Sequence, residues 1–94
     1  MLNLTHVEGS NRGHIALYAL STCGWCKKTK VFLNENGVAY SYVDVDLETG
    51  AERDKVIEEV VKWNPNSSFP TVVLNDEICL VGFQPDKMKE TLKL

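Results

Sequence analysis

The sequence lacks any long hydrophobic run. Its longest apolar stretch, residues 15–20, is far too short to span a bilayer. Residues 1–13 are polar and include Glu8 and Arg12, so they show neither the apolar segment nor the cleavage pattern of a secretory signal. We therefore expect a protein that has no membrane partner and that works in the cytoplasm.

The sequence also lacks a cluster of basic residues. Ten Lys and Arg residues and 13 Asp and Glu residues give a net charge of −3, and the two signs are intermixed along the chain. A nucleic-acid-binding surface normally requires a stripe or patch of positive charge. We therefore expect no nucleic-acid binding.

Cysteine is scarce, with Cys23, Cys26 and Cys79 as the only three in 94 residues. A secreted domain held together by disulfides usually has an even number of cysteines spread along the chain, whereas cytosolic cysteines are more often catalytic or metal-binding. The close pair, Cys23 and Cys26, is therefore the first candidate for chemistry. Cys79, in a predicted strand, is interpreted as a small buried apolar residue.

Hydrophobic periodicity predicts one α/β domain, because a chain of this length supports a single modest core. Residues 1–13 are expected to form a loose or partly strand-like N-terminal extension with too few apolar residues to define an element, and residues 14–94 the domain. Strands are predicted at residues 15–20, 38–45, 71–74 and 78–81, and helices at residues 24–36, 50–63 and 85–92, with Thr49 and Glu52 as a capping box. The order is βαβ, a helix and ββα, which predicts a four-stranded mixed sheet flanked by three helices.

The placement of Cys23 and Cys26 at a junction between strand and helix predicts thiol–disulfide exchange. Cys23 falls at the start of a helix, where unpaired N–H groups and a partial positive charge stabilise a thiolate. Cys26 lies one helical turn later on the same side, among apolar positions, within reach of a mixed disulfide on Cys23. We expect Cys23 to attack and Cys26 to resolve the mixed disulfide.

A Cys-x-x-Cys pair is also half of a zinc site, so metal binding is the alternative interpretation. A structural zinc site usually needs four ligands, and the other candidates are only Cys79, His6 and His14. The sequence has no second pair at ligand spacing. We therefore expect no metal site.

Two motifs in the chain resemble those of the glutaredoxins, a family within the thioredoxin-like superfamily. They are Thr22-Cys23-Gly24-Trp25-Cys26 and Ser68-Phe69-Pro70-Thr71. The resemblance implies a thioredoxin-like fold, a cis peptide bond before Pro70, and a Phe69 backbone free to pair with an extended substrate segment. It places substrate binding at Thr22, Gly24, Trp25, Phe69, Pro70, Gly82 and Phe83. Trp25 is expected to be exposed and to contact partners.

The chain differs from glutathione-using glutaredoxins at two places. Leu20 stands where those proteins carry Lys or Arg, and residues 81–86 read Val-Gly-Phe-Gln-Pro-Asp instead of containing Gly-Gly. The usual contacts with the glutathione carboxylates are thus poorly matched. The Gly-Phe-x-Pro-Asp stretch and Thr29-Lys30 resemble instead the redoxins that donate electrons to ribonucleotide reductase and are recycled by thioredoxin reductase.

The expected function is a monomeric dithiol–disulfide oxidoreductase that reduces disulfide-containing proteins or small disulfides. Its reductant is expected to be thioredoxin reductase or glutathione. No tightly bound cofactor is expected, and NADPH would act only through a reductase. The alternative is an iron–sulfur cluster carrier, because some glutaredoxins hold a cluster between two protomers. Lys27, Lys28 and Lys30 are interpreted as a solvated helix face, with docking or thiolate stabilisation as the alternative.

Overall fold

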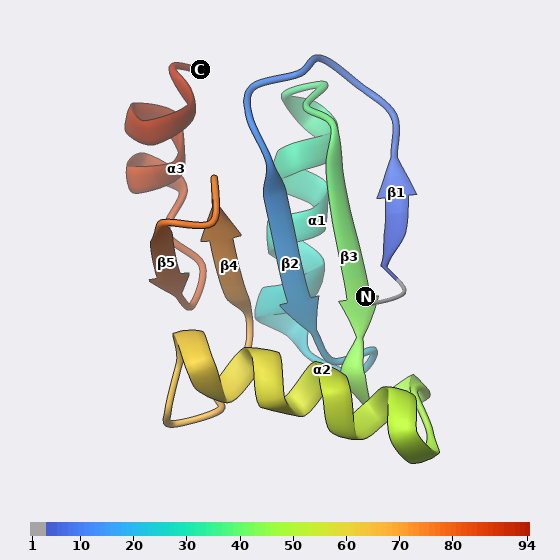
Figure 1. Ribbon diagram of the computed structural model, residues 1–94. Coiled ribbons are helices and arrows are strands. Elements are labelled where there is room, and N and C mark those ends of the chain that lie inside the picture. The colour runs from blue at the N-terminus through green and yellow to red at the C-terminus, as the bar shows by residue number, and fades with distance from the viewer. Residues whose placement is uncertain (1–3) are drawn as a thin grey trace.

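A mixed five-stranded sheet lies at the centre of the computed structural model, which describes residues 4–94. The elements are β1 (Thr5–Val7), β2 (Ile15–Ala19), α1 (Gly24–Glu35), β3 (Tyr40–Asp44), the short 3-10 helix η1 (Val45–Leu47), α2 (Gly50–Trp63), β4 (Thr71–Leu74), β5 (Ile78–Val81) and α3 (Pro85–Leu92). The strand order is β1-β3-β2-β4-β5 (Figure 1). Of these five strands, only β2 and β3 pair in parallel, as expected for a βαβ unit.

The expectation of a four-stranded sheet was wrong, because residues 5–7 add a fifth strand at one edge. β1 pairs antiparallel with β3, with Thr5 opposite Tyr42 and Val7 opposite Tyr40. The segment is three residues long and mostly exposed, so it has no hydrophobic periodicity of its own. Its strand conformation depends on the free edge of β3, which no local pattern reveals.

β2 is buried along its whole length, because it lies between β3 and β4 and helices cover both of its faces. Ile15, Leu17 and Ala19 belong to a core that includes residues of α1 and α3. Ala16 and Tyr18 belong to a second core that includes residues of α2. The continuous apolar run of this strand therefore reflects burial on both faces of the sheet. Three helices flank the sheet, as predicted.

The helix boundaries follow local chemistry with one exception. α1 ends just before Gly37, whose φ of +63° favours glycine, and α3 has Pro85 in its first turn. Thr49 is the N-cap of α2, but its side chain makes no capping hydrogen bond, so the predicted capping box does not form.

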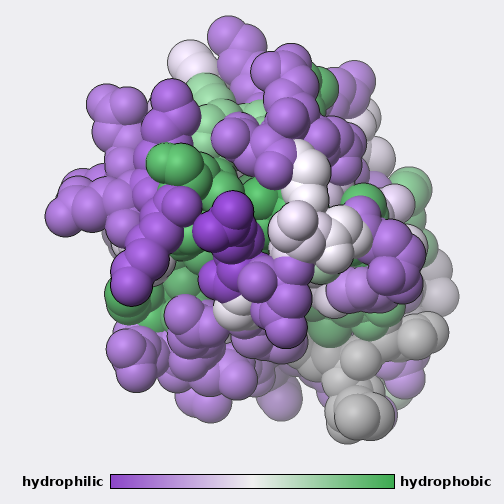
Figure 2. All heavy atoms as spheres, turned by 90° about the horizontal axis from the view of Figure 1, so that it is seen from above, coloured by the Kyte–Doolittle hydropathy of each residue, from purple (hydrophilic) through white to green (hydrophobic). Residues whose placement is uncertain are grey.

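The carboxyl end of β2 leads into α1 at the end of the sheet where α2 crosses (Figure 1). Figure 2 looks onto the opposite end of the molecule, whose surface is mostly hydrophilic. No helix within residues 4–94 is long and apolar enough to cross a membrane.

Candidate active site

Cys23 occupies the N-cap position of α1, immediately beyond the loop that follows β2. Its backbone is extended, with φ of −85° and ψ of 119°, and its Sγ accepts a hydrogen bond from the Cys26 N–H at 3.2 Å. The Cys23 N–H donates to the Leu20 carbonyl at 3.1 Å, which fixes the loop. The sulfur is partly exposed. The helix N-terminus and a direct N–H donor therefore both face the Cys23 sulfur.

Cys26 has the opposite environment, although it lies only one turn further along α1. Its side chain is fully buried in the core between the sheet and α1. Burial, together with a hydrogen bond to the Cys23 side chain, raises the pKa of the Cys26 thiol to about 12. The pair therefore consists of one accessible and one sequestered thiol, as the sequence predicted.

Aromatic side chains form the surface beside the cysteines. Trp25 is 58% exposed and stacks on Phe83, with ring centroids 6.2 Å apart and an interplanar angle of 30°. Phe83 in turn meets Phe32 of α1 edge to face, with centroids 6.0 Å apart. The Lys28 Nζ lies 4.6 Å above the Trp25 ring. These contacts hold the segment before α3 against α1.

The loop before β4 completes a groove next to Trp25. The peptide bond between Phe69 and Pro70 is cis, as the family resemblance implied, and Pro70 is buried. The Pro70 carbonyl accepts a hydrogen bond from the Gly82 N–H at 2.8 Å, and Gly82 has a φ of +83°, a conformation that favours glycine. This groove, which we name the substrate groove after the role proposed for it below, has a volume of about 210 Å³ and is lined by Trp25, Phe69, Pro70, Gly82 and Phe83.

Most of the residues expected to bind substrate are thus brought together by the fold. Thr22 and Gly24 differ from the others, because both are exposed on either side of Cys23 but do not line the substrate groove. Leu20 packs against the core on the α2 side of the sheet. Cys79 is partly exposed, so its expected full burial was wrong. β5 is an edge strand, which leaves that side chain less covered.

Sequence reasoning missed the buried amide of Asn64, which organises the loop before β4. Its Nδ2 lies 3.1 Å from the Ser68 carbonyl, from Ser68 Oγ and from Thr71 Oγ1, and its Oδ1 accepts from the Asn66 N–H at 3.2 Å. Thr71 Oγ1 donates to the Ser68 carbonyl at 2.8 Å. The only sequence signal was its position before Pro65, which indicates a helix end and not a buried network.

Asp46 is a second residue that the sequence did not reveal. Its Oδ1 accepts from the Ser21 N–H at 2.8 Å, and its Oδ2 accepts from the Ser21 hydroxyl. These hydrogen bonds lower the pKa of the Asp46 carboxyl and tie the loop before Cys23 to η1. Ser21 follows β2 and Asp46 lies in η1 after β3, so the parallel pairing of β2 and β3 brings the two residues together.

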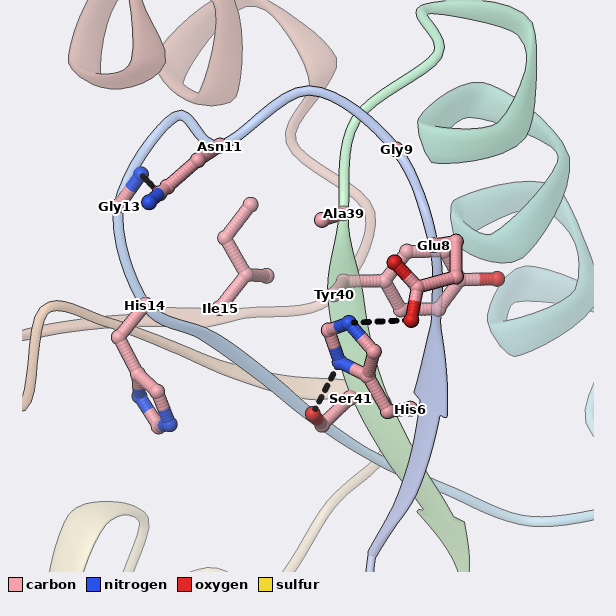
Figure 3. Close-up of a pocket in the computed structure, with 10 residues that line it drawn as sticks. All are labelled: His6, Glu8, Gly9, Asn11, Gly13, His14, Ile15, Ala39, Tyr40 and Ser41. Atoms are coloured by element: carbon pink, nitrogen blue, oxygen red, sulfur yellow. Dashed lines mark hydrogen bonds and ion pairs between the residues drawn. The ribbon is translucent and has the colours of Figure 1, made fainter.

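The two histidines do not converge on a metal site. His6 lines a pocket of about 580 Å³ that is formed by β1, the segment at residues 8–15 and the start of β3 (Figure 3). Its ring is 3.3 Å from Ser41 Oγ and 3.7 Å from a Glu8 carboxylate oxygen. His14 points away from His6 and instead approaches Asp76. Within residues 4–94, no group of three or more His, Cys, Asp or Glu side chains is arranged to hold a metal ion.

A mixed sheet flanked by three helices, with a Cys-x-x-Cys pair at the start of α1 and a cis proline before β4, defines a thioredoxin-like protein with a redox-active cysteine pair. Comparison with known families gives the finer assignment. The glutaredoxin family model matches residues 15–79, and the chain belongs to the glutaredoxin family.

Solved structures of similar proteins agree with this assignment. Methanoredoxin from Methanosarcina acetivorans is 48% identical, with a TM-score of 0.88 over 92% of this chain and 90% of that chain. A glutaredoxin from Methanosarcina mazei is 46% identical, with a TM-score of 0.88 over 97% of this chain and 88% of that chain. The glutaredoxin-like NrdH-redoxin from Escherichia coli, described as having a thioredoxin-like activity profile, shares the fold at 22% identity, with a TM-score of 0.62 over 82% of this chain and 92% of that chain.

Proposed function

We propose that this protein is a dithiol–disulfide oxidoreductase in which Cys23 attacks and Cys26 resolves. The observation that carries the proposal is the asymmetry of the pair: an accessible sulfur at a helix N-cap faces a fully buried thiol one turn away. Because only an accessible thiolate can meet an incoming disulfide, the first step is assigned to Cys23.

In the first step the Cys23 thiolate attacks one sulfur of the substrate disulfide. A bond forms between Cys23 and that sulfur, the substrate S–S bond breaks, and the other substrate sulfur leaves and takes up a proton. The Cys26 N–H, which is 3.2 Å from Cys23 Sγ, stabilises the attacking thiolate.

In the second step Cys26 gives up its proton and attacks Cys23 Sγ. The Cys23–Cys26 disulfide forms, the mixed disulfide breaks, and the second substrate sulfur leaves as a thiol. Two electrons have then passed from the cysteine pair to the substrate, whose sulfurs have taken up the Cys26 proton and one proton from the solvent. The high pKa of Cys26 keeps this thiol protonated until a mixed disulfide occupies Cys23.

The substrate groove offers the place for the segment that carries the disulfide. Trp25 and Phe83 supply an apolar wall, and the backbone of Phe69 offers hydrogen-bonding groups to an extended chain. Thr22 and Gly24, exposed beside Cys23, are assigned to the rim that the substrate crosses.

The proposed reductant is thioredoxin reductase, with glutathione as the alternative. The apolar packing of Leu20 supports this preference, because position 20 itself carries no cation in place of the Lys or Arg of glutathione-using glutaredoxins. NADPH would enter only through the reductase, and no tightly bound cofactor is needed. The proposed setting is the cytoplasm, where such reductases keep thiols reduced, and the proposed working form is a monomer.

The cysteine roles are tested by comparing Cys23→Ser, Cys26→Ser and Cys79→Ser. Cys23→Ser is expected to abolish disulfide reduction, because the attacking sulfur is gone. Cys26→Ser is expected to accumulate a mixed disulfide with a protein substrate, measured as a mass increase under non-reducing conditions. Cys79→Ser, the matched control, is expected to keep full activity. Full activity of Cys23→Ser would overturn the proposal.

The reductant is tested by NADPH consumption with a small disulfide in two coupled assays. One assay contains thioredoxin reductase, and the other contains glutathione and glutathione reductase. We expect NADPH consumption in the assay with thioredoxin reductase and none in the assay with glutathione and glutathione reductase. Equal turnover with glutathione would show that glutathione needs neither a cation at position 20 nor a Gly-Gly pair within residues 81–86.

A brown preparation made under anaerobic conditions would favour the alternative function, an iron–sulfur cluster carrier.

A further inference from the structure

A second apolar groove adjoins the substrate groove and runs along α1. This α1 groove has a volume of about 320 Å³ and is lined by Lys27, Lys28, Val31, Phe32, Glu35 and Phe83. Val31, in the middle of α1, is 52% exposed, so its aliphatic side chain is available to a partner. Because Phe83 lines both grooves, a chain that lies in the substrate groove can continue into the α1 groove.

The charged residues of the α1 groove differ in sign between its two ends. Lys30, the third lysine of the helix, forms an ion pair with Asp44 at 3.0 Å. Lys27 and Lys28 are exposed, and no carboxylate in the described part of the chain forms an ion pair with either of them. Glu35 lies at the far end of the α1 groove. The end nearest Cys23 is therefore positive, although the chain as a whole carries a net charge of −3.

We propose that the α1 groove binds a segment of the substrate protein that carries an acidic residue and an aliphatic residue near its reactive cysteine. The acidic side chain meets Lys27 and Lys28, and the aliphatic side chain packs on Val31, Phe32 and Phe83. The proposal rests on the proposed function and specifies which protein disulfides are reduced fastest. The apolar side chains of the α1 groove provide affinity for the segment, and the charges of Lys27 and Lys28 provide selectivity for an acidic residue.

Helix and strand geometry predict the spacing in the substrate. With a rise of about 1.5 Å per residue, Lys27 lies about 6 Å and Val31 about 12 Å beyond Cys23 along α1. An extended chain advances about 3.3 Å per residue, so these distances correspond to about two and about four residues from the substrate cysteine. Side chains at intervals of two residues point to the same side of an extended chain. The substrate cysteine and the residues two and four positions away from it can therefore all face this protein.

The test uses three nine-residue peptides, each with a central cysteine present as its mixed disulfide with 2-mercaptoethanol. The first peptide has Glu two residues and Leu four residues from the cysteine on both sides, with Ser elsewhere. The second replaces Glu with Lys, and the third replaces Leu with Ser. The rate of reaction with the reduced full chain is measured in single turnovers at low ionic strength.

The Glu peptide is expected to react about fivefold to tenfold faster than the Lys peptide, which corresponds to the modest energies of exposed ion pairs. The preference should decline in high salt. The double substitution K27E/K28E should reverse the preference between the Glu and Lys peptides. K89E makes the same type of charge change at an exposed residue of α3 outside the α1 groove, and it should keep the original preference. V31S should reduce the advantage of the Leu peptide over the Ser peptide.

Equal rates for the Glu and Lys peptides, or a preference that K27E/K28E leaves unchanged, would overturn the proposal. Failure of the proposed function gives a different result. In that case the unaltered chain would not reduce bis(2-hydroxyethyl) disulfide, a small neutral substrate that carries neither charge nor side chains for the α1 groove. Reduction of this compound without selectivity among the peptides would overturn only the α1 groove proposal.

Discussion

At the scale of single residues, Cys23 and Cys26 differ only in their surroundings. Cys23 lies at the end of the loop after β2, and its Sγ accepts a hydrogen bond from the Cys26 N–H. Cys26 lies in the core, where burial raises the pKa of its thiol to about 12. The spacing of two cysteines sets the distance between them, but burial decides their roles. The same distinction leads to a prediction about pH.

Replacing Cys26 with Ala should make the reduced protein less sensitive to alkali. Between the ordinary thiol pKa of 9.0 and about 12, the folded protein keeps the Cys26 proton while the unfolded chain loses it. The unfolded state then binds fewer protons, so the free energy of unfolding falls as pH rises through this window, by up to about 1.4 kcal/mol per pH unit. Urea unfolding under reducing, anaerobic conditions at pH 8 and pH 10.5 measures the slope.

Over this pH window, the free energy of unfolding of Cys26→Ala should fall less steeply with pH than that of the unaltered protein. Tyr18, whose pKa burial raises to about 12, remains in both proteins and contributes the same alkaline loss to each. Parallel slopes for the two proteins would show that Cys26 does not hold its proton in the folded state.

Asn64 acts through the loop that carries Phe69 and Pro70. Replacing Asn64 with Ala removes the hydrogen bonds that its buried amide makes with Ser68, Thr71 and Asn66, which should lower the free energy of unfolding by about 1–3 kcal/mol. The neighbouring Asn66→Ala is the control, because Asn66 is exposed and contributes its backbone N–H. Urea unfolding curves compare the two variants, and equal midpoints would contradict the role assigned to Asn64.

At the scale of elements, β1 forms one edge of the sheet and pairs only with β3 among the strands of residues 4–94 (Figure 1). Beyond its end, the Ser10 N–H donates to the Gly37 carbonyl at 2.8 Å, and the Ala39 N–H donates to the Ser10 carbonyl at 2.9 Å. Gly9 approaches the backbone so closely that a Cβ would lie 2.7 Å from Ala39 N and from the Gly37 carbonyl oxygen. This contact fastens the N-terminal segment to the turn after α1.

Replacing Gly9 with Ala should therefore loosen β1. The added methyl group meets backbone atoms that cannot turn away, so the free energy of unfolding should fall by about 1–3 kcal/mol. Amide exchange of Tyr42, opposite Thr5 in β1, should accelerate. Ser10→Ala is the control, because the bonds of Ser10 to Gly37 and Ala39 use its backbone only. Unchanged exchange at Tyr42 in Gly9→Ala would contradict this account.

At the scale of the whole molecule, the site is assembled from three separated segments. The loop after β2 supplies Cys23, the loop before β4 supplies Phe69 and Pro70, and the segment after β5 supplies Gly82 and Phe83. The strands that precede or follow these loops are neighbours in the sheet, in the order β2-β4-β5. Sheet topology therefore brings the redox pair and the substrate groove to one end of the molecule.

The sequence by itself determined β2, the three helices, the cysteine pair and the proline motif, because each leaves a local signature. The continuous apolar run, the 3.6-residue period of each helix and each of the two short motifs are formed by residues that are close together in the chain. The partly strand-like character expected for residues 1–13 did not define β1, because three mostly exposed residues become a strand only against the edge of β3.

Only the tertiary structure decided how distant residues meet. Trp25 stacks on Phe83, Asp46 binds the Ser21 backbone, and the Asn64 amide joins the end of α2 to the start of β4. Their partners lie in other turns or elements, so nothing in the surrounding sequence indicates them. Pairing across a sheet and packing across a core place such groups side by side, and this is a property of the folded chain as a whole.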